Sequence, residues 1–359
     1  RVMSAGGGYR YLLRTVAAGD GDRALSTPLT RYYAEAGTPP GRWLGSGVTA
    51  LGHGELTPGA QVSEAQLQLP VGMGRDPITG VPLGRAYPVY SSTAERVADR
   101  VAQLDPALGA VERGRRVAQI EAEEAARGSR RAVAGFDFTF SVPKSASVLW
   151  AVADAGTQAL IAQAHHEAVA AVVAFMEREV AAARTGATAG DGAVAQVDVT
   201  GLIATAFDHF DSRAGDPHLR THVVISNKAR TVLDGKWRSL DGRPMHAAVV
   251  ALSELHEAVF ADHMTRTFGV SWEPREMGRD RNPSWAITDA PEQLVAEFST
   301  RARQIEGDDF SNPPGPRRKQ HDTVGKKHRL ADVVRHEHDG LAALLPDPDQ
   351  VFLQLLRVT

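Results

Sequence analysis

The segment FDHFDSRAGDPHLRTHVVISNK, residues 207–228, decides how this chain is organised. Two runs that alternate apolar and polar residues flank a turn-rich stretch at residues 211–217, a pattern typical of a β-hairpin with a long loop. With the turn centred between Gly215 and Asp216, antiparallel pairing places His209 opposite His222. Opposed residues have Cβ atoms about 5 Å apart, so the two imidazoles can share one ion. Taken alone, the pattern is equally typical of two ordinary histidines on a sheet face.

The composition of the chain is that of a soluble globular protein. Its 359 residues suffice for one large domain or two smaller ones. There is no cysteine, which excludes disulfides and thiolate metal sites and fits a cytoplasmic location. We see no stretch that is long and apolar enough to span a bilayer, so no membrane insertion is expected.

The formal net charge of −3 gives no overall basic field, but the basic residues are clustered. Such clusters usually form a solvated surface, and the alternative is a track for phosphates. The clusters lie at residues 113–116, 127–131, 228–238 and 317–329. The candidates for DNA contact are Lys144, Arg213, Arg220, Lys228 and Arg230, of which only Lys228 and Arg230 belong to a cluster.

Four of the six tyrosines lie near the start of the chain, as Tyr9, Tyr11, Tyr32 and Tyr33. One interpretation is that these are amphipathic residues on helix faces, with phenols that reach water. The other is that they are phenolic nucleophiles.

A strand is predicted at residues 136–141, where Phe136, Phe138 and Phe140 alternate with polar residues. Its polar face carries one carboxylate, Asp137, which is either solvated or works in a cleft. Ser145 is expected to cap a short helix that follows, and Lys144 beside it can meet a phosphate.

Long amphipathic helices are predicted at residues 157–184 and 245–268. Their histidines, in the motifs His165-His166-Glu167 and His256-Glu257, lack the second histidine four residues later that a zincin helix requires. We therefore expect these histidines on helix surfaces. Residues 306–327 are rich in Pro, Gly and charge and indicate a linker before one or two short helices.

Together these stretches resemble the relaxase domain of the TrwC/MobF conjugative relaxases, in the HUH endonuclease superfamily. The resemblance covers Val2 to about Ile305 and is carried by the early tyrosines, RYYAEAGTPPGRWLGSG, GFDFTFSVPKSAS and the hairpin. It implies an α+β fold, with an antiparallel sheet flanked by helices as the palm and C-terminal helical fingers. The domains expected are a relaxase domain at 1–305 and a linker with a short helical segment at 306–359.

The resemblance implies that a tyrosine attacks a DNA phosphodiester at the nic site of a transfer origin and becomes joined to the 5′ phosphate. A phenol with a pKa near 10 needs help at neutral pH, and Asp137 would orient or deprotonate it, directly or through a histidine. A divalent cation held by histidines would polarise the phosphate, usually Mg²⁺ or Mn²⁺, with Zn²⁺ or Ni²⁺ as alternatives. The partners implied are single-stranded DNA and relaxosome accessory and coupling proteins.

Two features depart from the family pattern. Arg10 separates Tyr9 from Tyr11, where the family shows adjacent tyrosines, so either can be the first nucleophile and Tyr32 and Tyr33 match the second pair. The family pattern has a His-x-His pair on the second strand of the hairpin, and here Arg220 occupies the first position of that pair and His222 the second. His218 can replace the missing ligand only if the loop folds back, since the four strand residues from His218 to His222 span about 13 Å.

Three interpretations of Arg220 follow: a weak site of His209, His222 and water, an arginine that binds the phosphate itself, or impaired nicking. The rival functions are a DNA-binding module without catalysis and a metal-dependent phosphoesterase. No Walker-type loop is present in these 359 residues, so no helicase activity is expected of them.

Overall fold

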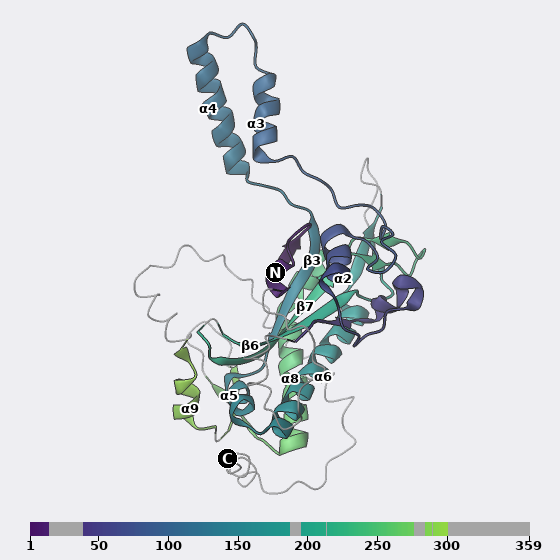
Figure 1. Ribbon diagram of the computed structural model, residues 1–359, viewed down its shortest axis with the longest axis vertical. Helices are drawn as coiled ribbons and strands as arrows, with labels where there is room; N and C mark the ends of the chain where they lie inside the picture. The colour runs from purple at the N-terminus through teal and green to yellow at the C-terminus, as the bar shows by residue number, and fades with distance from the viewer. Residues whose placement is uncertain (14–38, 187–194, 213, 276–283, 289, 301–359) are drawn as a thin grey trace.

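The computed structural model describes residues 1–13, 39–186, 195–212, 214–275, 284–288 and 290–300 (Figure 1). Tyr32, Tyr33 and Arg213 lie outside these residues, and so does the side chain of Tyr11. The linker and short helices expected from residue 306 onward also lie outside them, so the boundary near residue 305 and the helical fingers stay predictions.

A five-stranded sheet with the order β1-β3-β7-β6-β2 forms the centre, and every neighbouring pair is antiparallel. Its strands are β1 (Val2–Ser4), β2 (Arg42–Leu44), β3 (Val133–Ser141), β6 (Ala204–Asp211) and β7 (Pro217–Ser226). Three two-stranded ribbons accompany it: β4 (Ala182–Thr185) with β5 (Ala195–Asp198), β8 (Ala229–Arg230) with β9 (Trp237–Arg238), and β10 (Trp272–Arg275) with β11 (Ser284–Ile287). The antiparallel sheet with flanking helices confirms the predicted α+β class.

The alternation along β3 sets the two faces of the sheet. Phe136, Phe138 and Phe140 are buried on the back face, in one core cluster with residues of two long helices. Asp137 and Thr139 point to the opposite, front face, because successive strand residues alternate. The strand predicted at residues 136–141 is therefore confirmed and begins three residues earlier.

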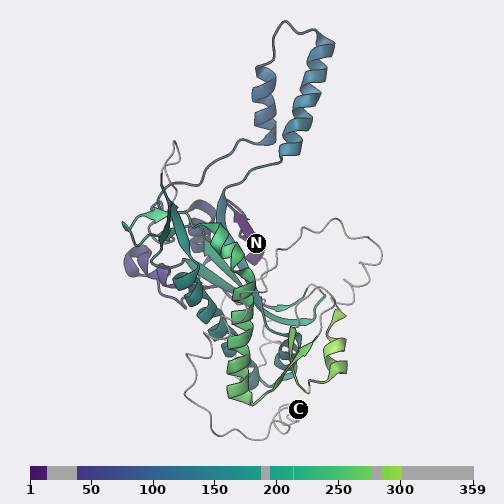
Figure 2. The same ribbon diagram turned by 180° about the vertical axis from the view of Figure 1, so that it is seen from behind.

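The back face is covered by α6 (Ala155–Glu179) and α8 (Val249–Phe268), which lie side by side in both views (Figures 1 and 2). The shorter helices are α2 (Glu64–Leu67), α5 (Lys144–Val152), α7 (Gly242–Ala247) and α9 (Glu292–Glu297), with η1 (Arg10–Leu13), η2 (Ser46–Ala50), η3 (Gly52–Gly54) and η4 (Gln68–Met73). The predicted helix at 157–184 ends at Glu179, and the one at 245–268 divides into α7 and α8. The N-cap position of α5 is Pro143 and not Ser145, and no side-chain hydrogen bond caps this helix.

Helix α6 is long and apolar enough to cross a membrane by length and composition alone, contrary to our expectation that no stretch is. Half of its apolar window is buried within the protein. Its buried residues, among them Ile161, Ala168 and Val172, face the sheet and α8. This is the packing of a core helix.

The front face is partly covered by a second core cluster, which includes Tyr9, Trp43, Phe207 and Val224. Between this layer and β3 the chain leaves the body as two antiparallel helices, α3 (Thr93–Ala102) and α4 (Ala110–Arg127), which project well beyond it (Figures 1 and 2). Only Ile120 and Glu124 of this α3–α4 arm are buried. Glu124 pairs with Arg96 and Arg100 of α3, so the arm is held together by its own ion pairs.

Candidate functional site

The β6–β7 hairpin is present, but its register differs from the prediction by two residues. His222 lies opposite Phe207, and His209 lies opposite Arg220. The turn is organised around Ser212, whose hydroxyl accepts hydrogen bonds from the N–H groups of Ala214 and Asp216. The centre of the turn therefore lies one residue before the predicted point between Gly215 and Asp216. As a result, each residue of β6 pairs with a β7 residue two positions earlier than predicted.

His209 and His222 nevertheless meet, as diagonal neighbours on the front face. Their ring centroids are 4.9 Å apart with the rings at 62°, as expected because diagonal strand neighbours are within reach of aromatic side chains. His222 Nδ1 lies 3.0 and 3.2 Å from the two carboxylate oxygens of Asp137, and 3.1 Å from Thr139 Oγ1. Since a carboxylate only accepts, Nδ1 carries a proton, and in the neutral ring the lone pair is therefore on Nε2.

Burial sets the environment of Asp137 and the protonation of His209. Asp137 is 4% exposed, so its carboxylate is not solvated and instead accepts a hydrogen bond from His222. Burial, together with the nearby His222 and Arg220, lowers the pKa of His209 to about 4. His209 is therefore neutral at pH 7, and its buried Nε2 has no hydrogen-bond partner among the described residues. A neutral imidazole with an unpartnered nitrogen is suited to bind a metal ion.

The expectation that His218 completes a metal site is not met. Strand β7 runs unbroken from Pro217 to Ser226, so the loop does not fold back. His218 Nδ1 instead lies 3.3 Å from Arg220 Nη1, and no group of three metal-binding side chains is present in the described part of the chain. Arg220 shares the front face with His209 and His222, so a guanidinium occupies the third position.

The start of the chain lies beside this group. The N–H of Asp137 donates to the carbonyl of Arg1 at 2.8 Å, and β1 pairs with β3 from Val2 onward. Tyr9 is only 2% exposed and packs in the front cluster with Phe207 and Val224. Its burial favours a structural role for Tyr9. The remaining candidates are Tyr11, whose side chain lies outside the described part of the structure, and Tyr32 and Tyr33, which lie outside it entirely.

The proposed phosphate contacts have different environments. Lys144 donates to the carbonyl of Pro217 at 3.0 Å, and burial lowers its pKa. Arg230 is exposed and donates to the carbonyl of Gly235. Lys228 is 2% exposed, with its ammonium on the carbonyl of Arg85 and 4.7 Å from the centre of the Tyr87 ring. The prediction that Lys228 contacts DNA is therefore wrong for this conformation.

Directly behind the site, on the back face, lies a buried hydrogen-bonded network that sequence reasoning missed. His165 contacts His256 (Nδ1 to Nε2, 3.0 Å) and Thr221 (Nε2 to Oγ1, 2.8 Å). Thr221 donates to Asp208, which also pairs with Arg42. His165 and His256 are fully buried and not on helix surfaces as expected. In α8 the buried positions recur every four residues from Leu252 to Phe268, and His256 is one of them.

The direction of each hydrogen bond in this network follows from its acidic end. Burial would raise the pKa of Asp208, but His166 and Arg42 outweigh it and hold the pKa well below its ordinary value. Thr221 therefore donates to a carboxylate and accepts from His165 Nε2–H. Neutral His165 then accepts at Nδ1, so His256 donates from Nε2. The network fixes Thr221, which lies between Arg220 and His222 in β7.

This network predicts that the fold is sensitive to acid. Burial lowers the pKa of His256 to about 4, from an ordinary value of 6.5. Between these values the unfolded chain binds a proton that the folded protein excludes, so stability is complete above pH 6.5 and falls as the pH approaches 4. The contribution of His256 is about 3 kcal/mol. Urea unfolding from pH 7 to 4.5 should show a smaller decline in His256→Gln than in the wild type.

The exposed His53 provides a control for this experiment. It has a positive φ of 55°, which asparagine tolerates, so His53→Asn should keep the wild-type pH dependence. Equal slopes in His256→Gln and the wild type would contradict the assignment.

Comparison with known proteins identifies the family. The model of the TrwC relaxase family matches residues 5–338. The chain belongs to the TrwC relaxase family. The multifunctional conjugation protein TraI of Escherichia coli is 28% identical over 193 residues, which cover 51% of this chain and 10% of TraI. TraI of strain K12 is 26% identical over 242 residues, which cover 63% of this chain and 13% of TraI. The chain thus spans only about a tenth of the length of these curated relatives.

Solved structures support the same fold. The metal-free complex of the conjugative relaxase TrwC with OriT DNA is similar with a TM-score of 0.57 and 21% identity, and the match covers 99% of this chain and 95% of that one. The metal-bound complex of TrwC with OriT DNA gives a TM-score of 0.56 at 22% identity, with the same coverage. At this identity the likeness concerns the fold alone.

Proposed function

We propose that this relaxase nicks one strand of DNA at a transfer origin by transesterification to a tyrosine. The phenol oxygen bonds to phosphorus and the P–O3′ bond breaks, which leaves a 5′-phosphotyrosine adduct and a free 3′ hydroxyl. The observation that carries the proposal is the group formed by Asp137, His222 and His209 on the front face of the central sheet. The solved complexes of TrwC contain OriT DNA, which supports single-stranded DNA as the substrate. The cytoplasm is the proposed location, and relaxosome accessory and coupling proteins are the proposed further partners.

The chain's own residues position the reaction. Asp137 holds the His222 ring in one tautomer and orientation, and carboxylate support of this kind fixes imidazoles in many sites. Arg220, opposite His209, provides a guanidinium whose planar N–H groups match phosphate oxygens. Tyr11, Tyr32 and Tyr33 are the proposed nucleophiles, and covalent attack retains the energy of the broken phosphodiester for later religation.

The donor set fits a divalent metal with two imidazole ligands. His209 has an unpartnered buried Nε2, and the tautomer of His222 leaves its lone pair on Nε2. These two residues would hold the ion, which when bound would act as a Lewis acid toward the scissile phosphate. Metal-bound TrwC supports such a cofactor. Mg²⁺ or Mn²⁺ remains the proposed identity, with Zn²⁺ or Ni²⁺ as alternatives.

A second candidate function follows from Arg220. A guanidinium at the third ligand position opposes a cation electrostatically. A relaxase-like module that binds DNA without nicking it is therefore the alternative. A phosphoesterase acting on small substrates is less well supported, because the family match and the OriT complexes of TrwC both point to DNA.

A covalent-capture assay tests the proposal. The protein is incubated with a labelled single-stranded oligonucleotide carrying its own transfer origin, with Mg²⁺, Mn²⁺, Zn²⁺ or Ni²⁺. We expect a band that survives denaturing electrophoresis, and peptide mapping should place the nucleotide on one of the early tyrosines. If no ion yields an adduct while the oligonucleotide still binds, the DNA-binding alternative holds instead.

A further inference from the structure

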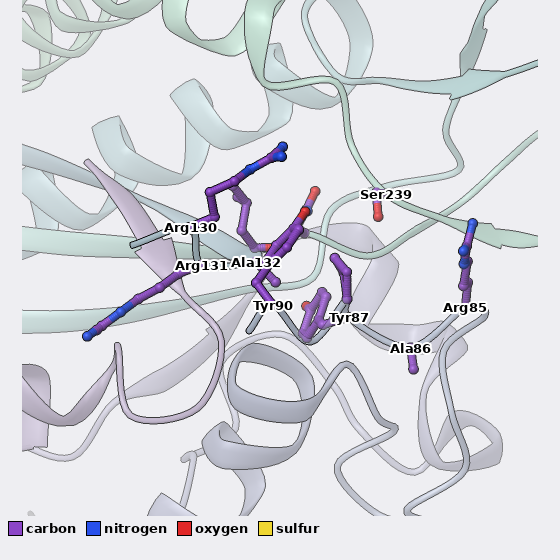
Figure 3. A pocket seen from close by; sticks show the side chains of 11 residues that line it. Arg85, Ala86, Tyr87, Tyr90, Arg130, Arg131, Ala132 and Ser239 are labelled. Carbon is purple, nitrogen blue, oxygen red and sulfur yellow. The ribbon is translucent and has the colours of Figure 1, made fainter. Parts of the chain in front are cut away.

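A second cleft, of about 560 Å³, lies at the base of the α3–α4 arm, away from His209 and His222. It is built from the segment before α3, the segment between α4 and β3, and the residues that follow β7 and β9. Figure 3 shows Arg130 and Tyr90 on one side of it and Arg85 on the other. The main lining side chains are Arg85, Tyr87, Tyr90, Arg130, Arg131 and Asn227.

The charge of this cleft is uniformly positive. Arg85, Arg130 and Arg131 line it, and none of its lining residues is a carboxylate. The buried ammonium of Lys228 lies directly behind, against the ring of Tyr87. Cations gathered in a concave site raise the local concentration of anions, so the cleft selects an anionic ligand.

Its aromatic side chains add a planar surface. Tyr90 is 40% exposed, and the guanidinium carbon of Arg130 lies 5.0 Å from its ring centre. Tyr87 is held in place, because its single hydroxyl proton lies between two acceptors, the carbonyls of Ala134 at 3.0 Å and Pro70 at 3.2 Å. Aromatic rings combined with arginine are the surface on which single-stranded nucleic acids stack their bases.

A buried hydrogen-bond acceptor, Asn227 Oδ1, makes the cleft favour ligands that carry an N–H group. Asn227 is 8% exposed, and its Nδ2 donates to the carbonyl of Val133 at 2.8 Å. Because a carbonyl only accepts, this bond fixes the orientation of the amide. Asn227 Oδ1 then has no hydrogen-bond partner among the described residues. An unpartnered buried acceptor is suited to receive an N–H group.

We propose that this cleft binds one nucleotide of single-stranded DNA, with the base stacked on Tyr90. Arg85 and Arg130 contact its phosphate, and Asn227 favours a base with an exocyclic amine. The inference rests on the proposed function, because it assumes the same DNA strand. Five residues of extended chain separate Asn227 from His222, about 17 Å, so one strand can occupy both places.

The test uses two fluorescent oligonucleotides of twelve nucleotides, dC12 and dT12, with affinity measured by anisotropy. Cytosine presents an amine where thymine presents an oxygen. We expect Tyr90→Ala to weaken dC12 binding about tenfold and Tyr90→Phe, which keeps the ring, to bind as the wild type does. Arg130→Ala should lower both the affinity and its salt dependence. Wild-type protein should bind dC12 about fivefold more tightly than dT12, and Asn227→Ser should remove that preference.

Arg266→Ala removes an exposed arginine from α8 and is the matched charge control. Thermal melting confirms that each variant is folded. Wild-type affinity for dC12 in both Tyr90→Ala and Arg130→Ala would overturn the inference, whatever the nicking result. If the wild type forms no covalent adduct but Tyr90→Ala still weakens dC12 binding, the inference about the cleft holds and the proposed nicking activity is refuted.

Discussion

Asp137→Asn should lower the rate of covalent adduct formation about 100-fold at neutral pH. In the wild type, the carboxylate accepts from His222 Nδ1–H at 3.0 Å and so keeps the lone pair on Nε2. An amide has no charge and can turn its NH₂ toward Nδ1, which reverses the tautomer and places the proton on Nε2. The ring then presents a donor where the site requires an acceptor. Single-turnover kinetics with saturating oligonucleotide measure the loss.

Two comparisons separate this effect from general damage. Asp262→Asn makes the same change at an exposed ion pair on α8 and should leave the rate unchanged. DNA affinity in Asp137→Asn should stay close to the wild type, because Asp137 is 4% exposed and has little contact with solvent. A wild-type rate in Asp137→Asn would remove Asp137 from the site.

Arg220→His should raise the affinity for Mn²⁺ by about 100-fold or more. Arg220 lies opposite His209 and shares the face of His222, so an imidazole at this position adds a third ligand. The substitution also removes a positive charge that repels the ion by a few kcal/mol at effective protein dielectric constants. Titration calorimetry measures the affinity, and the covalent-capture assay measures whether nicking increases with it.

Arg230→His is the matched control for this experiment. Arg230 is exposed on β8, so the new histidine lies on a surface ribbon and metal affinity should not change. A large gain in both metal binding and nicking in Arg220→His identifies the wild type as an impaired relaxase. Unchanged metal affinity would show that position 220 is not directed at the ion.

Local patterns predicted the strand around Phe136 and the β6–β7 hairpin, whereas the antiparallel sheet was implied by the family resemblance and its edge strands β1 and β2 were not predicted. The alternation around Phe136, Phe138 and Phe140 placed Asp137 on the polar face of its strand, because strand periodicity leaves only two faces. The structure shows that His222 lies on the same face. The contact between His209 and His222 was predicted, but from the wrong register. Pairing depends on hydrogen bonds of the Ser212 side chain within the turn, which residue spacing does not encode.

The back-face network was beyond sequence reasoning for a different reason. Helical spacing does not distinguish a buried histidine from an exposed one, because burial depends on whether distant side chains hydrogen-bond its ring nitrogens. His165 is buried because His256 and Thr221, 91 and 56 residues away, satisfy both of its ring nitrogens. The same holds for Lys228, whose partner is a backbone carbonyl 143 residues away.

The α3–α4 arm leaves and rejoins the body at neighbouring points, since Tyr90 before it and Arg130 after it are in contact. Its helices are held by their own ion pairs and contribute little to either core. Such a segment is an accessory module on a single stalk. Lengthening or removing it is therefore expected to leave the strands that carry the chemistry undisturbed.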